Sequence, residues 1–289
     1  MRSWFVIPAM GAVAGGAAVA LGITPVVALS GAALAAVIRV LAGDSPAALT
    51  GAVIAPVLAV ASFADAGGEL ARAALALAAA GWAVTELARA PGAATSPLVV
   101  VLPAALAGIL DPRLVVLVVI AGVRLVGAAP RPRWALGVVL AGGLALALAV
   151  LAGTAWPALG DRWFGGPAHP IAPAALAQIA GATLGPLTAV AALAGLGSLV
   201  RARHAELAVA AAIAGAILGD LRAGTLGLVT IGLAALLAGF SIGRLAALIR
   251  IPSGQAIAGA TIGALVVLPP AWTAIAHRPP DAHSGQASR

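Results

Sequence analysis

The chain has 289 residues, of which 62% are hydrophobic and only 9% are charged. Soluble domains carry about 25% charged residues, so a water-soluble fold would lack the polar side chains to cover its surface. The absence of cysteine and lysine excludes disulfides, thiolate nucleophiles, Cys-ligated zinc and Schiff-base chemistry. The sequence predicts an all-α, polytopic transmembrane helix bundle over 1–276 and a polar, disordered C-terminal tail over 277–289.

Apolar runs long enough to cross a bilayer follow one another along the chain. A helical span needs about 20 apolar residues, with a range of about 17–25. The runs between charges and turn residues predict eleven spans: 4–22, 25–42, 46–63, 70–88, 97–110, 114–129, 134–154, 172–200, 205–219, 224–243 and 255–276. Runs 97–110 and 114–129 are short, and Asp111-Pro112-Arg113 alone separates them. We favour two short spans joined by an interfacial turn over one re-entrant element, because charges at mid-membrane are expensive.

The arginines predict how these spans are oriented. With the N-terminus in the cytoplasm and the C-terminus outside, ten of the 16 arginines lie inside, including the pairs Arg131/Arg133 and Arg201/Arg203. The net charge of +7 does not indicate nucleic-acid binding, because the arginines are scattered rather than gathered in a patch. The Ala-, Gly- and Arg-rich composition is typical of GC-rich coding. We expect a protein integral to the cytoplasmic membrane of a bacterium, with the lipid bilayer as its partner.

Glycines recur at a spacing that lets helices pack closely. Small residues four apart allow backbones to approach where no hydrophobic force drives association. We expect most of these pairs to pack within the chain; a face for binding other membrane proteins is the alternative. The pairs are Gly11/Gly15, Gly181/Gly185, Gly215/Gly219, Gly239/Gly243 and Gly259/Gly263.

The run 172–200 is long and contains a helix-breaking residue, Pro186. We expect its helix to bend or break between Gly181 and Thr188. Transporters build substrate sites from broken helices that carry polar groups, which makes Gln178, Thr183 and Thr188 candidate substrate-binding residues. We expect Gln178 to face protein rather than lipid, because an unpaired amide in hydrocarbon is costly. The alternative is a kinked packing helix whose threonines bond to their own backbone.

Carboxylates stand beside arginines in the loops predicted to lie outside. Such groups can bind a phosphate headgroup and move a proton, and the aspartates would then converge with Arg162 or Arg222 on one groove. The alternative is a set of interfacial anchors, each aspartate paired with its neighbouring arginine. The dispersed histidines predict no metal site, and we expect no cofactor. The candidate catalytic residues are Asp65, Asp111, Asp161, Asp220 and His169, and the candidate substrate-binding arginines are Arg162 and Arg222.

Three classes of function remain open. The sparse polar inventory favours a structural or accessory membrane protein; the alternatives are a small-solute or lipid transporter and an outer-leaflet enzyme acting on a lipid-linked, polyprenyl-phosphate-type substrate. The layout is loosely similar to membrane glycosyltransferases that use polyprenyl-phosphate sugars. Those enzymes carry an acidic motif in a developed first outer loop, which here is only Ile23-Thr24-Pro25, so no catalytic residue transfers. A polar cavity ending at Gln178 would favour transport, and an outer groove joining the aspartates would favour the enzyme.

Overall fold

The structure, a computed structural model, describes residues 25–43, 45, 50–55, 57–58, 70–88, 97–128, 171–199 and 204–276. Every regular element in these ranges is helical, and no strand occurs among them, which confirms the predicted all-α class for this part of the chain. The predicted spans 4–22 and 134–154 and the tail lie outside the described residues. Of the predicted span 46–63, residues 50–55 and 57–58 are described, and they are helical.

The helices begin and end close to the predicted bounds. Three helices begin and end at the predicted residues: α2 (Pro25–Ala42), α4 (Leu70–Ala88) and α5 (Pro97–Leu110). The predicted run 172–200 is broken into α8 (Pro173–Leu184) and α9 (Pro186–Ser198). Proline begins α2, α5, α8, α9 and α12, a position where its missing N–H costs no helical hydrogen bond. The remaining elements are the 3₁₀ turn η2 (Pro112–Leu114), α6 (Val116–Ala128), α10 (His204–Ala223), α11 (Leu228–Ala246) and α12 (Pro252–Ala276).

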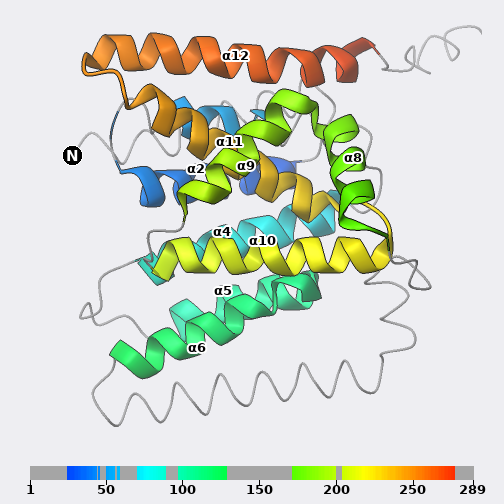
Figure 1. The fold of residues 1–289 in the computed structure, drawn as a ribbon. Coiled ribbons are helices and arrows are strands. Elements are labelled where there is room, and N and C mark those ends of the chain that lie inside the picture. The colour runs from blue at the N-terminus through cyan, green and yellow to red at the C-terminus, as the bar shows by residue number, and fades with distance from the viewer. Residues whose placement is uncertain are drawn as a thin grey trace, which may run out of the picture.

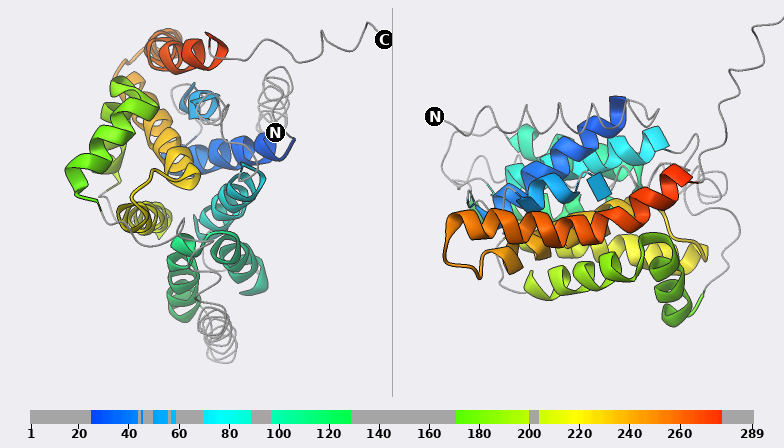
Figure 2. Two further views of the ribbon diagram at one scale, coloured as in Figure 1. Left: turned by 90° about the vertical axis from the view of Figure 1, so that its right-hand side faces the viewer. Right: turned by 90° about the horizontal axis from the view of Figure 1, so that it is seen from above.

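Helix α11 lies at the centre of the described bundle. It packs most extensively on α9 and also contacts α2, α4, α10 and α12 (Figure 2). On the other side of α2, the helices α4, α5 and α6 follow in order, each packed on the one before it, and α10 crosses beside α4 and α6. Figure 1 shows α12 at one edge of this assembly and α5 and α6 at the opposite edge.

Several of the described helices expose large apolar side chains. The buried face of α4 is mostly alanine and glycine, whereas Leu75 and Trp82 are exposed. On α5 the exposed side chains include Leu102, Leu106 and Ile109, which share one face at helical spacing. A helix facing water has the opposite distribution. Helices α4 and α11 are long and apolar enough to cross a membrane, and α8 with α9 forms a third candidate if the bent pair is one span.

Glycines bring the helices into backbone contact. A Cβ atom on Gly239 of α11 would lie 2.6 Å from the carbonyl oxygen of Gly51 and 2.8 Å from the Cβ of Ala55. A Cβ on Gly259 of α12 would lie 2.8 Å from Thr50 Cγ2, and Gly219 of α10 leaves equally little room beside Arg113. Three of the five predicted Gly-x-x-x-Gly pairs therefore pack within the chain, as expected. Gly181 differs, because no atom lies within 4 Å of where its Cβ would be.

Candidate functional site

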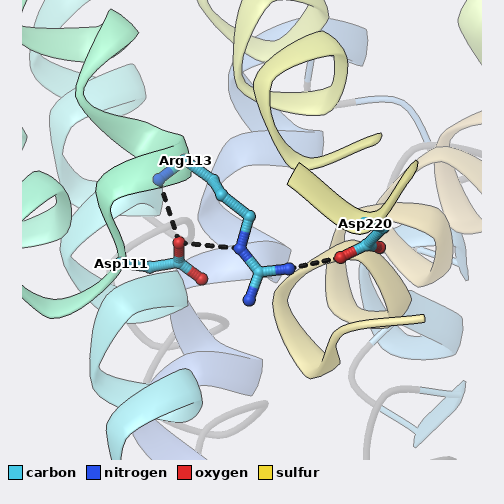
Figure 3. A network of polar contacts seen from close by, with 3 residues as sticks. All are labelled: Asp111, Arg113 and Asp220. Carbon is cyan, nitrogen blue, oxygen red and sulfur yellow. Dashed lines mark hydrogen bonds and ion pairs between the residues drawn. The ribbon is translucent and has the colours of Figure 1, made fainter. Parts of the chain in front are cut away.

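The turn between α5 and α6 carries a buried charged network. The Arg113 guanidinium donates through Nε to Asp111 Oδ1 at 2.9 Å and forms an ion pair through Nη1 with Asp220 Oδ1. Figure 3 shows the two carboxylates on either side of the guanidinium. Asp220 is fully buried, and the side chains of Asp111 and Arg113 are only 7% and 14% exposed. The turn packs against α10, and the Asp111 side chain within it is buried.

Local sequence explains the position of Asp111 and Arg113. Pro112 disfavours the helical conformation in the preceding residue, so α5 ends at Leu110 and Asp111 is extended (φ −141°, ψ 109°). The Asp111 carboxylate then caps η2 by accepting a hydrogen bond from the Arg113 backbone N–H at 3.0 Å. One side chain therefore terminates α5, begins η2 and orients the guanidinium.

Two glycines make room for the arginine to reach α10. A Cβ atom on Gly219 would lie 2.6 Å from Arg113 Cγ, and one on Gly227 would lie 3.1 Å from Arg113 Cζ and 2.8 Å from Asp220 Oδ1. Any larger residue at either position would displace the side chain. The spacing of Gly219 predicts close helix packing, and in the structure the space beside Gly219 is filled by the Arg113 side chain.

The network leaves two buried polar atoms without a partner. Neither Asp220 Oδ2 nor Thr230 Oγ1 has a hydrogen-bond partner among the described residues. Asp220 lies beyond the predicted span 205–219, in the last turn of α10. Burial raises the pKa of its carboxyl, and the Arg113 guanidinium opposes that rise. The two carboxylates share one guanidinium.

An apolar cavity of about 280 Å³ begins beside this network and is enclosed by α8, α9, α10 and α11. Its walls include Leu176 of α8, Leu196 of α9 and Leu237 of α11. Thr230 is the only polar residue among the described residues that line it. This cavity is apolar and Gln178 does not line it, so it is not the polar cavity ending at Gln178 that would favour transport of a polar solute.

The cavity exists because the chain bends sharply between α8 and α9. The direction of the helix axis changes by 119° at the break, and Gly185 there has φ +79°, a conformation that favours glycine. Pro186 follows as the first residue of α9. The expected break between Gly181 and Thr188 is confirmed. Figure 1 shows α8 turned steeply away from the line of α9.

The structure brings some candidate residues together and separates others. Asp111 and Asp220 converge on Arg113, so the alternative in which each aspartate pairs with only its neighbouring arginine does not hold for Asp220. The expectation that Gln178 faces protein is also wrong, because its side chain is exposed, as is that of Thr183. Thr188 is buried on α9, and its hydroxyl has no partner among the described residues. Asp65, Asp161, Arg162 and His169 and the side chain of Arg222 lie outside the described part.

The positions of two residues at this site could not be predicted from the sequence. Arg113 was visible beside Asp111, but nothing local indicates that it reaches α10. Thr230 stands alone in an apolar run, and no spacing marks it as part of a cavity wall. No group of histidine and acidic residues in the described ranges has the geometry of a metal site.

A surface hollow of about 500 Å³ lies between η2 and α10. Arg113 and Pro112 contribute to its wall, but neither Asp111 nor Asp220 does. The carboxylates are therefore not presented on a groove where a substrate could reach them. No family model, curated protein or solved structure matches this sequence.

Proposed function

We propose that this chain is a multi-pass membrane protein that admits a lipid-like molecule to the cavity beside the α8–α9 break and carries it within the bilayer. The observation that carries this proposal is the position of an apolar cavity at a helix broken by 119°. Transporters place their sites at discontinuous helices because the break opens space at membrane depth. An apolar wall in that space suits an apolar cargo rather than a polar solute.

The mouth of the cavity supports entry from the lipid phase. Pro173, Ala177 and Leu193 line the cavity and are exposed at the surface of the described bundle. Leu193 is 69% exposed, and Val190 beside it on α9 is 65% exposed. Large apolar side chains at this exposure are stable when lipid is the solvent. A lipid chain can therefore pass from the surface of α9 into the cavity without crossing a polar barrier.

The buried carboxylates give the enzyme alternative less support. General acid–base catalysis needs a carboxylate within hydrogen-bond reach of the substrate. Both Asp111 and Asp220 instead form ion pairs with Arg113, and Asp111 also accepts a hydrogen bond from the backbone at the start of η2. Their geometry suits a structural clamp that holds the α5–α6 hairpin to α10.

Transbilayer movement of a fluorescent phospholipid in proteoliposomes tests the proposal. Dithionite quenching of the outer-leaflet label reports how fast inner-leaflet lipid becomes accessible. We expect wild-type protein to accelerate this movement over protein-free liposomes and Leu193→Trp to abolish the acceleration by blocking the mouth. Val190→Trp is the matched control, because Val190 is similarly exposed on the same helix but does not line the cavity.

Equal rates with and without protein would overturn the transport proposal. The accessory role would then be the better account of the chain. Equal rates in wild type and Leu193→Trp, both above the protein-free rate, would place lipid movement elsewhere in the protein and would reject the cavity as its route.

A further inference from the structure

The connection between α11 and α12, residues 247–251, forms a turn at one end of the bundle (Figure 1). Each of its residues is exposed, including the large apolar side chains of Leu248 at 78% and Ile251 at 65%. The preceding helix α11 is long and apolar enough to cross a membrane. A turn that ends such a helix lies at the bilayer surface, where exposed apolar side chains meet lipid rather than water.

Hydrogen bonds within the protein hold the backbone of this α11–α12 turn. The N–H groups of Leu248 and Ile249 donate to the carbonyl oxygens of Leu245 and Ala246, each at 3.1 Å. The side chain of Gln255, in the first turn of α12, donates through Nε2 to the Ile249 carbonyl oxygen at 2.7 Å. These backbone groups need no water as a partner, so the turn can enter the edge of the hydrocarbon region at little cost.

Two arginines accompany the exposed apolar side chains. Arg250 lies within the turn and is exposed, and Arg244 lies in the last turn of α11 with its Cζ atom 5.8 Å from the centroid of the Phe240 ring. That distance allows a cation–π contact, which orients a guanidinium without using an anion. Neither guanidinium forms an ion pair with a described residue. Both therefore keep N–H donors for phosphate oxygens, which a guanidinium binds through two parallel hydrogen bonds.

The described part of the chain offers these arginines no exposed carboxylate. The sequence from 221 to 280 contains no aspartate or glutamate. Every acidic residue in the described ranges is buried, namely Glu86, Asp111, Glu206 and Asp220. A second copy of the described bundle would thus bring apolar surface to the turn but no carboxylate. The complement of the turn is an anionic layer above an apolar one, which is what a leaflet with acidic phospholipid presents.

We infer that the α11–α12 turn docks on anionic phospholipid headgroups. Arg244 and Arg250 bind the phosphates, while Leu248 and Ile251 lie among the first methylene groups of the acyl chains. Arginine suits this arrangement because its long side chain reaches from an apolar surface to the headgroup level. The inference does not use the cavity, so it applies to a transporter and to an accessory membrane protein alike.

Quenching by brominated lipids in proteoliposomes of the full chain tests the inference. The sequence has no cysteine, so Ser253→Cys, at an exposed position beside the turn, provides a single site for a fluorescent probe. The bilayer contains equal phosphatidylglycerol and phosphatidylcholine, and one lipid at a time carries bromine near the headgroup end of its chains. We expect the anionic lipid to associate with the probe site at least about fivefold more strongly, the effect of a basic residue near an anionic surface.

Substitutions in the same labelled chain identify the groups responsible. We expect Arg250→Gln to lower the preference for phosphatidylglycerol about fivefold. Arg250→Lys is the matched control, because it keeps the charge, and it should retain most of the preference. Leu248→Ser should weaken quenching by both lipids without changing their ratio, because it removes an apolar contact and no charge.

Each contrary result rejects a defined part of the inference. Equal quenching by the two brominated lipids would reject selectivity for anionic headgroups. No quenching by either lipid would overturn the docking and would mean that the turn faces water, a second copy or another protein. An unchanged preference in Arg250→Gln would reject the role of Arg250. The lipid-movement assay is a separate measurement, so a failure of the transport proposal leaves this result unaffected.

Discussion

Arg113 of η2 forms an ion pair with Asp220 of α10, a residue 107 positions further along the chain. This contact joins the α5–α6 hairpin to the helix that forms one wall of the cavity. Asp111 bonds to the same guanidinium, so the side chains of Asp111, Arg113 and Asp220 form one network among apolar helices. The network therefore holds the end of α10 against the α5–α6 hairpin. Both carboxylates are buried, so a substrate does not reach them.

Removing the central cation should be strongly destabilising. Arg113→Met leaves two buried carboxylates without their shared partner, which we expect to cost about 3–5 kcal/mol. The free energy of unfolding in mixed micelles measures the loss. Arg250→Met is the control: Arg250 is exposed, and we expect a change within about 0.5 kcal/mol. Adding Asp220→Asn to Arg113→Met should recover part of the loss, and no recovery would show that Asp220 is not a main source of it.

The stability contributed by Asp220 should depend on pH in a direction opposite to that of an exposed ion pair. Burial raises the pKa of Asp220 above the ordinary value of 3.8, so the folded protein holds the proton more tightly than the unfolded chain. Relative to Asp220→Asn, wild type should be most stable below that ordinary pKa and lose the advantage as pH rises through the raised value. Unfolding of both proteins across this range measures it. A wild type that gains stability with rising pH would show that Arg113 outweighs burial.

The glycine contacts predict contrasting effects of one substitution. Gly239→Leu forces side-chain atoms into the Gly51 carbonyl and Ala55, and we expect a loss of about 1–3 kcal/mol, because overpacked contacts of this kind require backbone shifts. Gly181→Leu on α8 meets open space and should be tolerated. Thermal unfolding in detergent compares the two. Similar loss in both would mean that the α11 contact is not the cause.

The break between α8 and α9 should depend on the conformation of Gly185. Gly185→Ala places a Cβ at φ +79° and ψ 149°, where we expect a cost of about 1–3 kcal/mol from steric strain. Gly197→Ala is the control, because Gly197 is helical and has room for a Cβ; we expect it to be neutral or stabilising. The free energies of unfolding of the two variants test this. Equal effects would indicate that the left-handed conformation is not required.

The orientation predicted from the arginines stays a prediction and has a direct test. Reporter fusions after Arg133 and after His169 should report opposite sides of the membrane, the first cytoplasmic and the second outside. A cytoplasmic signal from the second fusion would reject the eleven-span scheme.

Local chemistry made the helix bounds predictable from the sequence. Proline, glycine and charge act on the residues beside them, so the ends of α2, α4 and α5 could be placed without knowledge of the fold. The break at Gly185-Pro186 was predictable for the same reason, since proline removes a helical hydrogen bond wherever the helix lies. Composition was equally informative, because it depends on no contact: too few polar residues were present to cover a fold in water.

Only the tertiary structure decided which helix faces meet. These helices are apolar on every side, so no polar stripe in the sequence marks the face that packs inward. We expect Gln178 inside from the sequence, and it lies exposed; nothing near Asp220 in the sequence indicates its ion pair with Arg113. The position of Thr230 on the cavity wall was unpredictable for the same reason. Whether a polar group is a partner, an anchor or an unpaired hydroxyl depends on helix rotation and close packing, which contacts between distant segments determine.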